Sequence, residues 1–116
     1  MIGIVGTRKR STPRNMGIVK KAFLEVYEEG DWICSGGCEQ GADNFAERFA
    51  RKYGIPIVIF HADWDKHGKA AGPIRNTIIA KYSDVLIACV ARTRKGGTED
   101  TITKFEKRRG KKAIIV

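Results

Sequence analysis

Short apolar runs alternate with longer amphipathic segments along the whole chain. The apolar runs cover residues 1–5, 31–34, 55–60, 84–90 and 113–116, and each has the length of a β-strand. The run at 55–60 is continuously apolar, which is typical of a strand covered on both faces in a parallel sheet. The pattern therefore predicts five strands.

Between these runs, apolar residues recur at the spacing of a helix, so each intervening segment predicts one helix with an apolar face. These faces consist of Val19, Ala22, Phe23, Val26 and Tyr27, then Ala42, Phe45, Ala46, Phe49, Ala50 and Tyr53, then Ile74, Ile78 and Tyr82, and finally Ile102 and Phe105. Gly30, Gly54 and Gly110 follow the first, second and fourth helices, where a glycine commonly ends a helix.

The regular alternation of strands and helices predicts an α/β fold. Such a chain forms a parallel sheet joined by right-handed crossovers. We expect a Rossmann-like three-layer sandwich of about five parallel strands with helices on both faces. The 116 residues fit one domain, spanning residues 1–116.

The connector at residues 61–76 (HADWDKHGKAAGPIRN) is unusually long. A strand and a helix need only about 2–6 residues between them, and longer connectors are usually functional. Trp64 and the Gly72-Pro73 turn indicate an ordered binding loop. The alternatives are that Trp64 only covers apolar surface and that His61 and His67 are structural or solvent-facing.

Glycine-rich or polar motifs follow each of the first four predicted strands. In open α/β sheets, ligands bind beyond the carboxyl ends of the strands, where glycine turns and helix N-termini accept anions. Hydroxyl groups and arginines at the same ends supply donors to a phosphate. The predicted ligand-binding residues are Gly6, Thr7, Arg8, Ser35, Gly36, Gly37, Gly41, Asp43, Asp63, Trp64, Gly72, Arg75, Asn76, Gly97 and Thr98.

Simpler interpretations exist for single members of this set. Any one glycine can be only a tight turn, and Asp43 can merely cap its helix. Arg75, by contrast, lies in the first turn of a predicted helix, where the dipole favours anions, so we expect it to have a functional role. The motifs match neither the GxGxxG pattern of dinucleotide dehydrogenases nor the GxxxxGK[ST] pattern of ATPases.

The net charge of +9 favours an anionic partner. Residues 8–21 hold six basic side chains and no acidic one, and residues 104–112 hold six basic side chains and Glu106. A phosphorylated small molecule or, less favoured, a nucleic acid suits this charge, although a basic cluster can also be a plain solvated face.

Three cysteines, Cys34, Cys38 and Cys89, are neither a disulfide framework nor a paired CxxC metal motif, so we expect buried thiols and no metal or other cofactor. No apolar run approaches the ~18 residues of a membrane span, so we expect no membrane partner. The chain starts on a strand-like segment, from which we expect a cytoplasmic protein.

Taken together, the motifs resemble a known group. GTR after the first strand, SGGxxxGAD after the second, ADWxxxGxxAGPxRN after the third and GT at the fourth helix are similar to the SLOG superfamily, in particular its small YspA-like branch, related to YpsA. The resemblance implies a Rossmann-like domain that binds nucleotides or nucleotide-derived ligands. Other members are LOG-type phosphoribohydrolases, which cleave the base from a nucleoside 5′-monophosphate, and DprA, which binds single-stranded DNA.

The LOG-type pattern is incomplete in this chain. Arg75 fits the arginine on the helix before strand four, and Gly97-Thr98 fits the GT of the PGGxGTxxE loop, but the glutamate position holds Thr101. We therefore place binding of a nucleotide-like ligand first. An N-glycosidic hydrolase with Asp43, Asp63 or Asp65 as acid and Arg75 orienting the phosphate comes second, and nucleic-acid binding third. Related folds self-associate through a helix face, which leaves a homo-oligomer as a further expectation.

Overall fold

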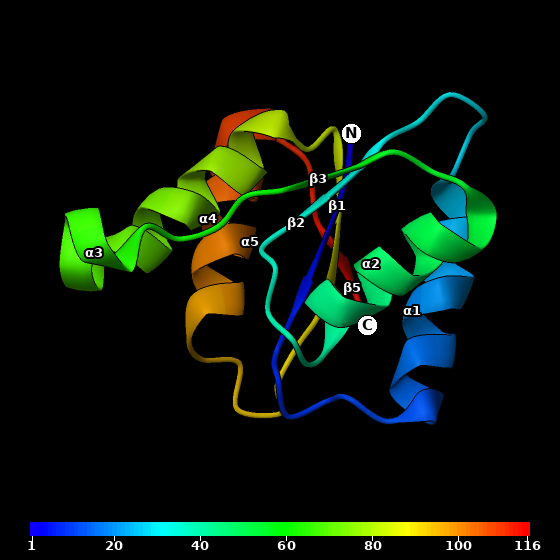
Figure 1. Cartoon of the computed structure of the whole chain (residues 1–116), viewed down its shortest axis with the longest axis horizontal. Coiled ribbons are helices and arrows are strands. Elements are labelled where there is room, and N and C mark those ends of the chain that lie inside the picture. The colour runs from blue at the N-terminus through cyan, green and yellow to red at the C-terminus, as the bar shows by residue number, and fades with distance from the viewer.

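The computed structural model, which describes all of residues 1–116, is a five-stranded parallel sheet with helices on both faces (Figure 1). The strands are β1 (Ile2–Gly6), β2 (Ile33–Ser35), β3 (Ile57–Ile59), β4 (Val85–Cys89) and β5 (Ile114–Ile115). The helices are α1 (Pro13–Val26), α2 (Ala42–Tyr53), α3 (Trp64–His67), α4 (Ala71–Tyr82) and α5 (Gly97–Arg109), with a short 3₁₀ turn, η1 (Gly68–Ala70), between α3 and α4. The predicted fold class is confirmed.

Two hydrophobic clusters hold the layers together, one on each face of the sheet. Successive side chains of β1 point to opposite faces, as a strand requires. Ile2 and Ile4 join the cluster under α1 and α2, which includes Phe23. Val5 joins the other cluster with Phe105, under α4 and α5. The periodicity of α1, α2 and α5 correctly predicted these buried faces, except for Tyr53 at the end of α2, which is exposed.

The strand order β3-β2-β1-β4-β5 places the reversal of strand order between β1 and β4. These two strands pair over five residue positions, from Ile2 opposite Val85 to Gly6 opposite Cys89. The chain leaves β1 toward one side of the sheet and β4 toward the other, so the loops that follow them separate. This separation opens a crevice beyond their carboxyl ends.

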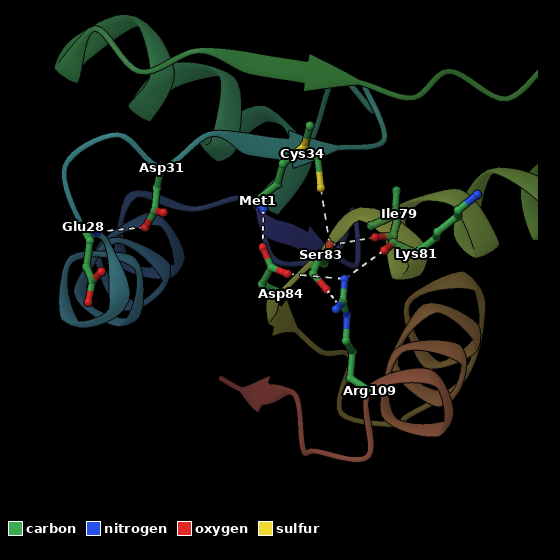
Figure 2. Close-up of polar contacts among 9 residues, drawn as sticks. All are labelled: Met1, Glu28, Asp31, Cys34, Ile79, Lys81, Ser83, Asp84 and Arg109. Carbon is green, nitrogen blue, oxygen red and sulfur yellow. Dashed lines mark hydrogen bonds and ion pairs between the residues drawn. The ribbon is translucent and has the colours of Figure 1, made fainter.

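At the amino ends of the strands, opposite the crevice, polar contacts hold neighbouring segments together (Figure 2). The Asp84 carboxylate accepts from the Met1 amino group at 2.7 Å and lies 3.4 Å from Arg109 Nη2. Ser83 Oγ donates to the carbonyl oxygen of Ile79 and lies 3.4 Å from Cys34 Sγ. The crevice at the carboxyl ends is therefore the open side of the sheet.

The end of α1 and the start of β2 differ from the prediction. The helix ends at Val26, with Tyr27 in an extended conformation, and not at Gly30. Gly30 instead occupies a positive-φ position in a tight turn, in which the Asp31 carboxylate accepts from the Glu28 amide (Figure 2). Because Asp31 belongs to this turn, β2 begins only at Ile33.

Strand β3 lies at the edge of the sheet and contacts the hydrophobic clusters on both faces, as predicted, although the cover is only partial. All three of its residues are only half-buried. Ile57 packs against one cluster and Val58 against the other, while the outer side has no neighbouring strand. The apolar run therefore reflects contact with both clusters at an edge.

The face of α4 was also predicted wrongly. Ile74 and Tyr82 are exposed, and the buried side carries Ala71, Asn76, Ile79 and Ala80. This side mixes small and polar residues, because the alanines leave room for the sheet and Asn76 is hydrogen-bonded to α5. An apolar periodicity cannot reveal such a face.

No helix combines the length with the apolar character that a membrane span requires. The cytoplasmic location stays a prediction.

Candidate functional site

A cavity of about 580 Å³ opens at the carboxyl ends of β1, β2 and β4. Its walls are the loops after these three strands, residues of α3 and α4, and the first turn of α5. This volume falls within the roughly 300–1,000 Å³ of typical ligand sites. We call this cavity the strand-end pocket.

The strand-end pocket brings together most of the predicted ligand-binding residues. Its lining includes Gly6, Thr7, Arg8, Gly36, Gly37, Asp43, Trp64, Arg75, Asn76, Gly97 and Thr98. Ser35, Gly41, Asp63 and Gly72 do not line it. Ser35, Gly41 and Gly72 lie behind its walls, where they set the positions of residues that do.

Gly41 lets the start of α2 approach the loop after β1. A Cβ at this position would lie 2.4 Å from the carbonyl oxygen of Thr7. Gly41 also has φ +75° and ψ −154°, a conformation that L side chains rarely adopt, and its amide donates to Ser11 Oγ. Gly6 plays a similar part, because a Cβ there would lie 2.8 Å from the Cβ of Ala42.

Asp43 is a buried carboxyl that holds the loop after β2. Its Oδ2 accepts from the amide of Cys38 at 3.0 Å, and its Oδ1 lies 3.1 Å from the hydroxyl oxygen of Ser35. Both partners lie outside α2, whose N-cap is Gly41, so Asp43 does not cap its helix. It ties the floor of the pocket to β2.

Burial raises the pKa of Asp43 above its ordinary value, although hydrogen bonds from Cys38 and Ser35 and the positive charge of Arg75 oppose this. The geometry favours the same direction. The Ser35 hydroxyl has one hydrogen but faces two acceptors, Asp43 Oδ1 and, at 2.6 Å, the carbonyl oxygen of Ile4. A proton on Asp43 would satisfy both contacts.

Arg75 is fixed against the loop after β2. Its Nη1 donates to the carbonyl oxygen of Gly36 at 2.8 Å, and its Nε donates to Asn76 Oδ1 at 3.1 Å. A side chain at Gly36 would displace this contact, since a Cβ would lie 2.7 Å from Arg75 Nη1 and 2.9 Å from Asp43 Oδ2. Nη2 has no partner within the chain and remains available to a ligand.

The helix α4 starts at Ala71, so Arg75 lies in its second turn and not in its first as predicted. The position of Arg75 relative to the helix dipole therefore gives less support to a functional role. The contact with Gly36 now supports that role, because it holds the guanidinium at the pocket wall.

Asn76 connects α4 to the first turn of α5. Its Nδ2 donates to the carbonyl oxygen of Gly97 at 3.3 Å and to Asp100 Oδ2 at 3.1 Å. Lys104 donates to the same Asp100 oxygen at 2.8 Å. Since Asn76 also accepts from Arg75, one chain of hydrogen bonds runs from Gly36 to α5.

Several amide N–H groups on the pocket lining make no hydrogen bond within the chain. They include those of Arg8, Gly37, Gly97 and Thr98. The N-cap of α5, Gly96, offers no side chain to satisfy the first turn. Unsatisfied amides from three loops around one cavity form a setting for an anion.

Trp64 forms the side wall of the strand-end pocket. The indole is 60% exposed, and its Cη2 lies 3.3 Å from the position of a Cβ at Gly72. Gly72 therefore makes room for the ring, inside α4 and not in a turn before it. His61 lies beside Gly37, where a Cβ would be 2.8 Å from its Cε1.

The stretch 61–76 is largely helical and not an irregular loop. Asp63 caps α3 by accepting from the Lys66 amide at 3.1 Å, and its side chain is exposed. An aspartate followed by a short helix is a capping signal that the sequence did contain. Asp63 thus has a structural role and lies outside the pocket lining.

The prediction did not include eight lining residues: Val5, Cys38, His61, Ala62, Ile79, Lys95, Gly96 and Thr101. Cys38, Lys95 and Gly96 adjoin predicted motifs, so a wider window around each strand end would have found them. Thr101 is buried and donates to the Gly97 carbonyl oxygen. No group of three or more potential metal-binding side chains comes together.

Comparison with known families identifies part of this chain. The family model described as YAcAr, the YspA, cpYpsA-related SLOG family, matches residues 21–67. This range includes the end of α1, all of α2 and the motif after β2, and it confirms the resemblance to the SLOG superfamily. Neither curated proteins nor solved structures gave a match.

Proposed function

We propose, from the match of residues 21–67 to the YspA, cpYpsA-related SLOG family, that this protein binds a nucleotide or a nucleotide-derived phosphorylated ligand in the strand-end pocket. The observation that carries the proposal is the set of unpartnered amides in three loops whose residues line one cavity beside the fixed Arg75. These are the groups that a phosphate requires, and they belong to separate elements held in place by the fold.

The phosphate end of the ligand is assigned to the region between the loop after β1 and the first turn of α5. Arg8, Lys95 and Thr98 line this region. A single helix terminus contributes only about 0.3–1 kcal/mol to anion binding. Useful affinity therefore needs several contacts, and Arg75 Nη2 adds a charged donor from α4.

The base end is assigned to Trp64. Trp64 is exposed and lines the pocket, and stacking of a base on an aromatic ring is worth about 1–3 kcal/mol. His61, which lies beside Gly37, also lines the pocket. A ligand with a phosphate at one end and an aromatic base at the other fits this polarity.

One observation favours the hydrolase as a second candidate. Asp43 lines the pocket, and burial raises the pKa of its carboxyl, as a general acid requires. However, both of its oxygens already bond within the protein, and Thr101 occupies the position of the motif glutamate. Binding without catalysis therefore comes first.

Isothermal titration against nucleoside 5′-monophosphates, nucleoside diphosphates and ADP-ribose tests the proposal. At least one of these should bind, and Arg75→Ala should weaken it roughly 10- to 100-fold, the loss of one charge-assisted hydrogen bond of about 1.5–3 kcal/mol. Arg108→Ala, which removes an exposed cation at the end of α5, is the control and should bind normally.

Absence of binding across the panel would refute the proposal. Chromatography of the same mixtures after long incubation separates the two candidates, because only the hydrolase releases free base. Release that persists in Asp43→Asn would remove Asp43 as the acid.

A further inference from the structure

A second cavity, of about 420 Å³, lies between α1 and α2, the two helices that cover one face of the sheet. Lys20 of α1 and Arg48, Arg51 and Lys52 of α2 line it, and the rest of the lining is Met16 and the buried Phe49. We call it the α1–α2 groove. It shares no residue with the strand-end pocket.

The four cations of the α1–α2 groove have no acidic partner within 4 Å. Every ion pair of the protein lies elsewhere, and Glu47, the nearest acid in sequence, is in none of them. By contrast, Arg94, Lys104 and Arg109 are each paired with a carboxylate. The groove therefore concentrates uncompensated positive charge.

The arrangement of these cations is regular. Arg48, Arg51 and Lys52 have the i, i+3 and i+4 spacing that places three side chains on one face of α2. Lys20 faces them from α1. Positive charge thus lines both sides of a groove, which suits an extended anionic chain better than a flat surface.

Tyr53, the last residue of α2, does not line the groove itself but lies beside two of these cations. The ring is 38% exposed, with Lys20 Nζ 5.9 Å and Lys52 Nζ 5.5 Å from its centroid. The sequence separates Tyr53 from the basic cluster at 8–21, and only the packing of α1 against α2 brings it beside Lys20. An aromatic ring beside several cations is the combination that single-strand binding surfaces use.

We propose that the α1–α2 groove binds single-stranded nucleic acid, with the phosphates along the four cations and a base stacked on Tyr53. A paired base offers no free face to a tyrosine at the surface, so single strands are favoured over duplex. The proposal does not depend on a ligand in the strand-end pocket.

Fluorescence anisotropy with labelled oligothymidylate and oligouridylate of about 12 nucleotides tests this proposal. The charge variant is Lys20→Gln with Lys52→Gln, and the matched control is Lys107→Gln with Lys111→Gln, which removes the same charge from exposed sites at the end of α5 and beyond it. We expect at least a tenfold loss of affinity in the first and less than a threefold loss in the second. The slope of log affinity against log salt should fall by about 1.4 in the charge variant, at roughly 0.7 per lost phosphate contact.

Tyr53→Phe and Tyr53→Ala distinguish stacking from general attraction. Phenylalanine should keep the affinity within about twofold, whereas alanine should lose roughly 5- to 100-fold, the range for one stacked base. Circular dichroism of each variant checks that the fold is retained.

Three results would overturn the proposal: equal losses in both lysine pairs, unchanged binding in Tyr53→Ala, or absence of oligonucleotide binding at low salt. Loss of oligonucleotide binding in Arg75→Ala would place the strand in the strand-end pocket instead. Tighter binding to vesicles of anionic lipid than to oligonucleotides would assign the groove to a membrane surface.

Discussion

Asn76 is the position at which a one-atom change tests the hydrogen-bond chain behind the pocket. Asn76→Asp replaces the Nδ2 amide by an oxygen while keeping the size of the side chain. That atom lies 3.1 Å from Asp100 Oδ2 and 3.3 Å from the Gly97 carbonyl oxygen. Asn76 is 6% exposed, whereas the Asp100 side chain is 38% exposed, so water reaches the new contact from the Asp100 side only. In the variant, an oxygen without a hydrogen therefore lies against two acceptor oxygens.

The cost follows from these contacts. A hydrogen bond to a charged group is worth about 1.5–3 kcal/mol and a neutral one about 0.5–1.5 kcal/mol. Repulsion between the introduced carboxylate and Asp100 adds to this loss, while Arg75 and Lys104 offset part of it. We expect Asn76→Asp to lower the free energy of unfolding by about 3–5 kcal/mol at pH 7, a loss reserved for a few mechanisms such as buried charge.

Urea denaturation at several pH values measures this loss. The neighbouring carboxylate raises the pKa of the introduced carboxyl, so the destabilisation should be largest at high pH and shrink as the pH falls and that group takes up a proton. Asn76→Ala, which loses the bonds without adding charge, should cost about 2 kcal/mol with no such pH dependence. A loss under 1 kcal/mol in Asn76→Asp would refute the hydrogen-bond chain as described.

Two further substitutions test the walls of the pocket. Gly41→Ala should destabilise the protein by at least about 2 kcal/mol, because of the positive φ of Gly41 and its contact with Thr7. Gly17→Ala, with open space around its Cβ inside α1, is the control and should stabilise the protein by about 0.5–1 kcal/mol. Similar melting temperatures of the two variants would contradict this expectation. For Asp43, the raised pKa makes a stabilising contribution that is complete below about 3.9, the unfolded value, and is lost as the pH rises through the folded value. Asp43→Asn should therefore gain stability relative to the wild type between about pH 4 and 7 in urea denaturation, and parallel curves would show that Asp43 does not titrate in this range.

Hydrophobic periodicity predicted the fold because most elements bury a plain apolar face. Phe23 in α1 and Phe105 in α5 are fully buried, as their spacing required. The prediction failed at α4, whose inner face depends on Asn76. A buried amide is stable only through partners such as Gly97 and Asp100, which lie far along the chain, so no local pattern reports it.

The location of the candidate site was also predictable from the sequence, whereas several of its contacts were not. Motifs at strand ends located the pocket, since parallel strands bring their carboxyl ends to one edge. The roles of Gly36 and Gly41 were not predictable, because each makes room for an atom from a distant segment, whereas Gly72 makes room for Trp64 of the same connector. Tyr53 was predicted on the apolar face of its helix, whereas it is exposed beside Lys20, which belongs to another helix.

The most direct test of the central claim is to follow the backbone amides by ¹H–¹⁵N NMR while a nucleoside 5′-monophosphate is added. We expect the largest chemical-shift changes at the unpartnered amides of Arg8, Gly37, Gly97 and Thr98, together with the indole N–H of Trp64. Unchanged spectra at millimolar ligand, or shifts confined to residues away from the strand-end pocket, would contradict it.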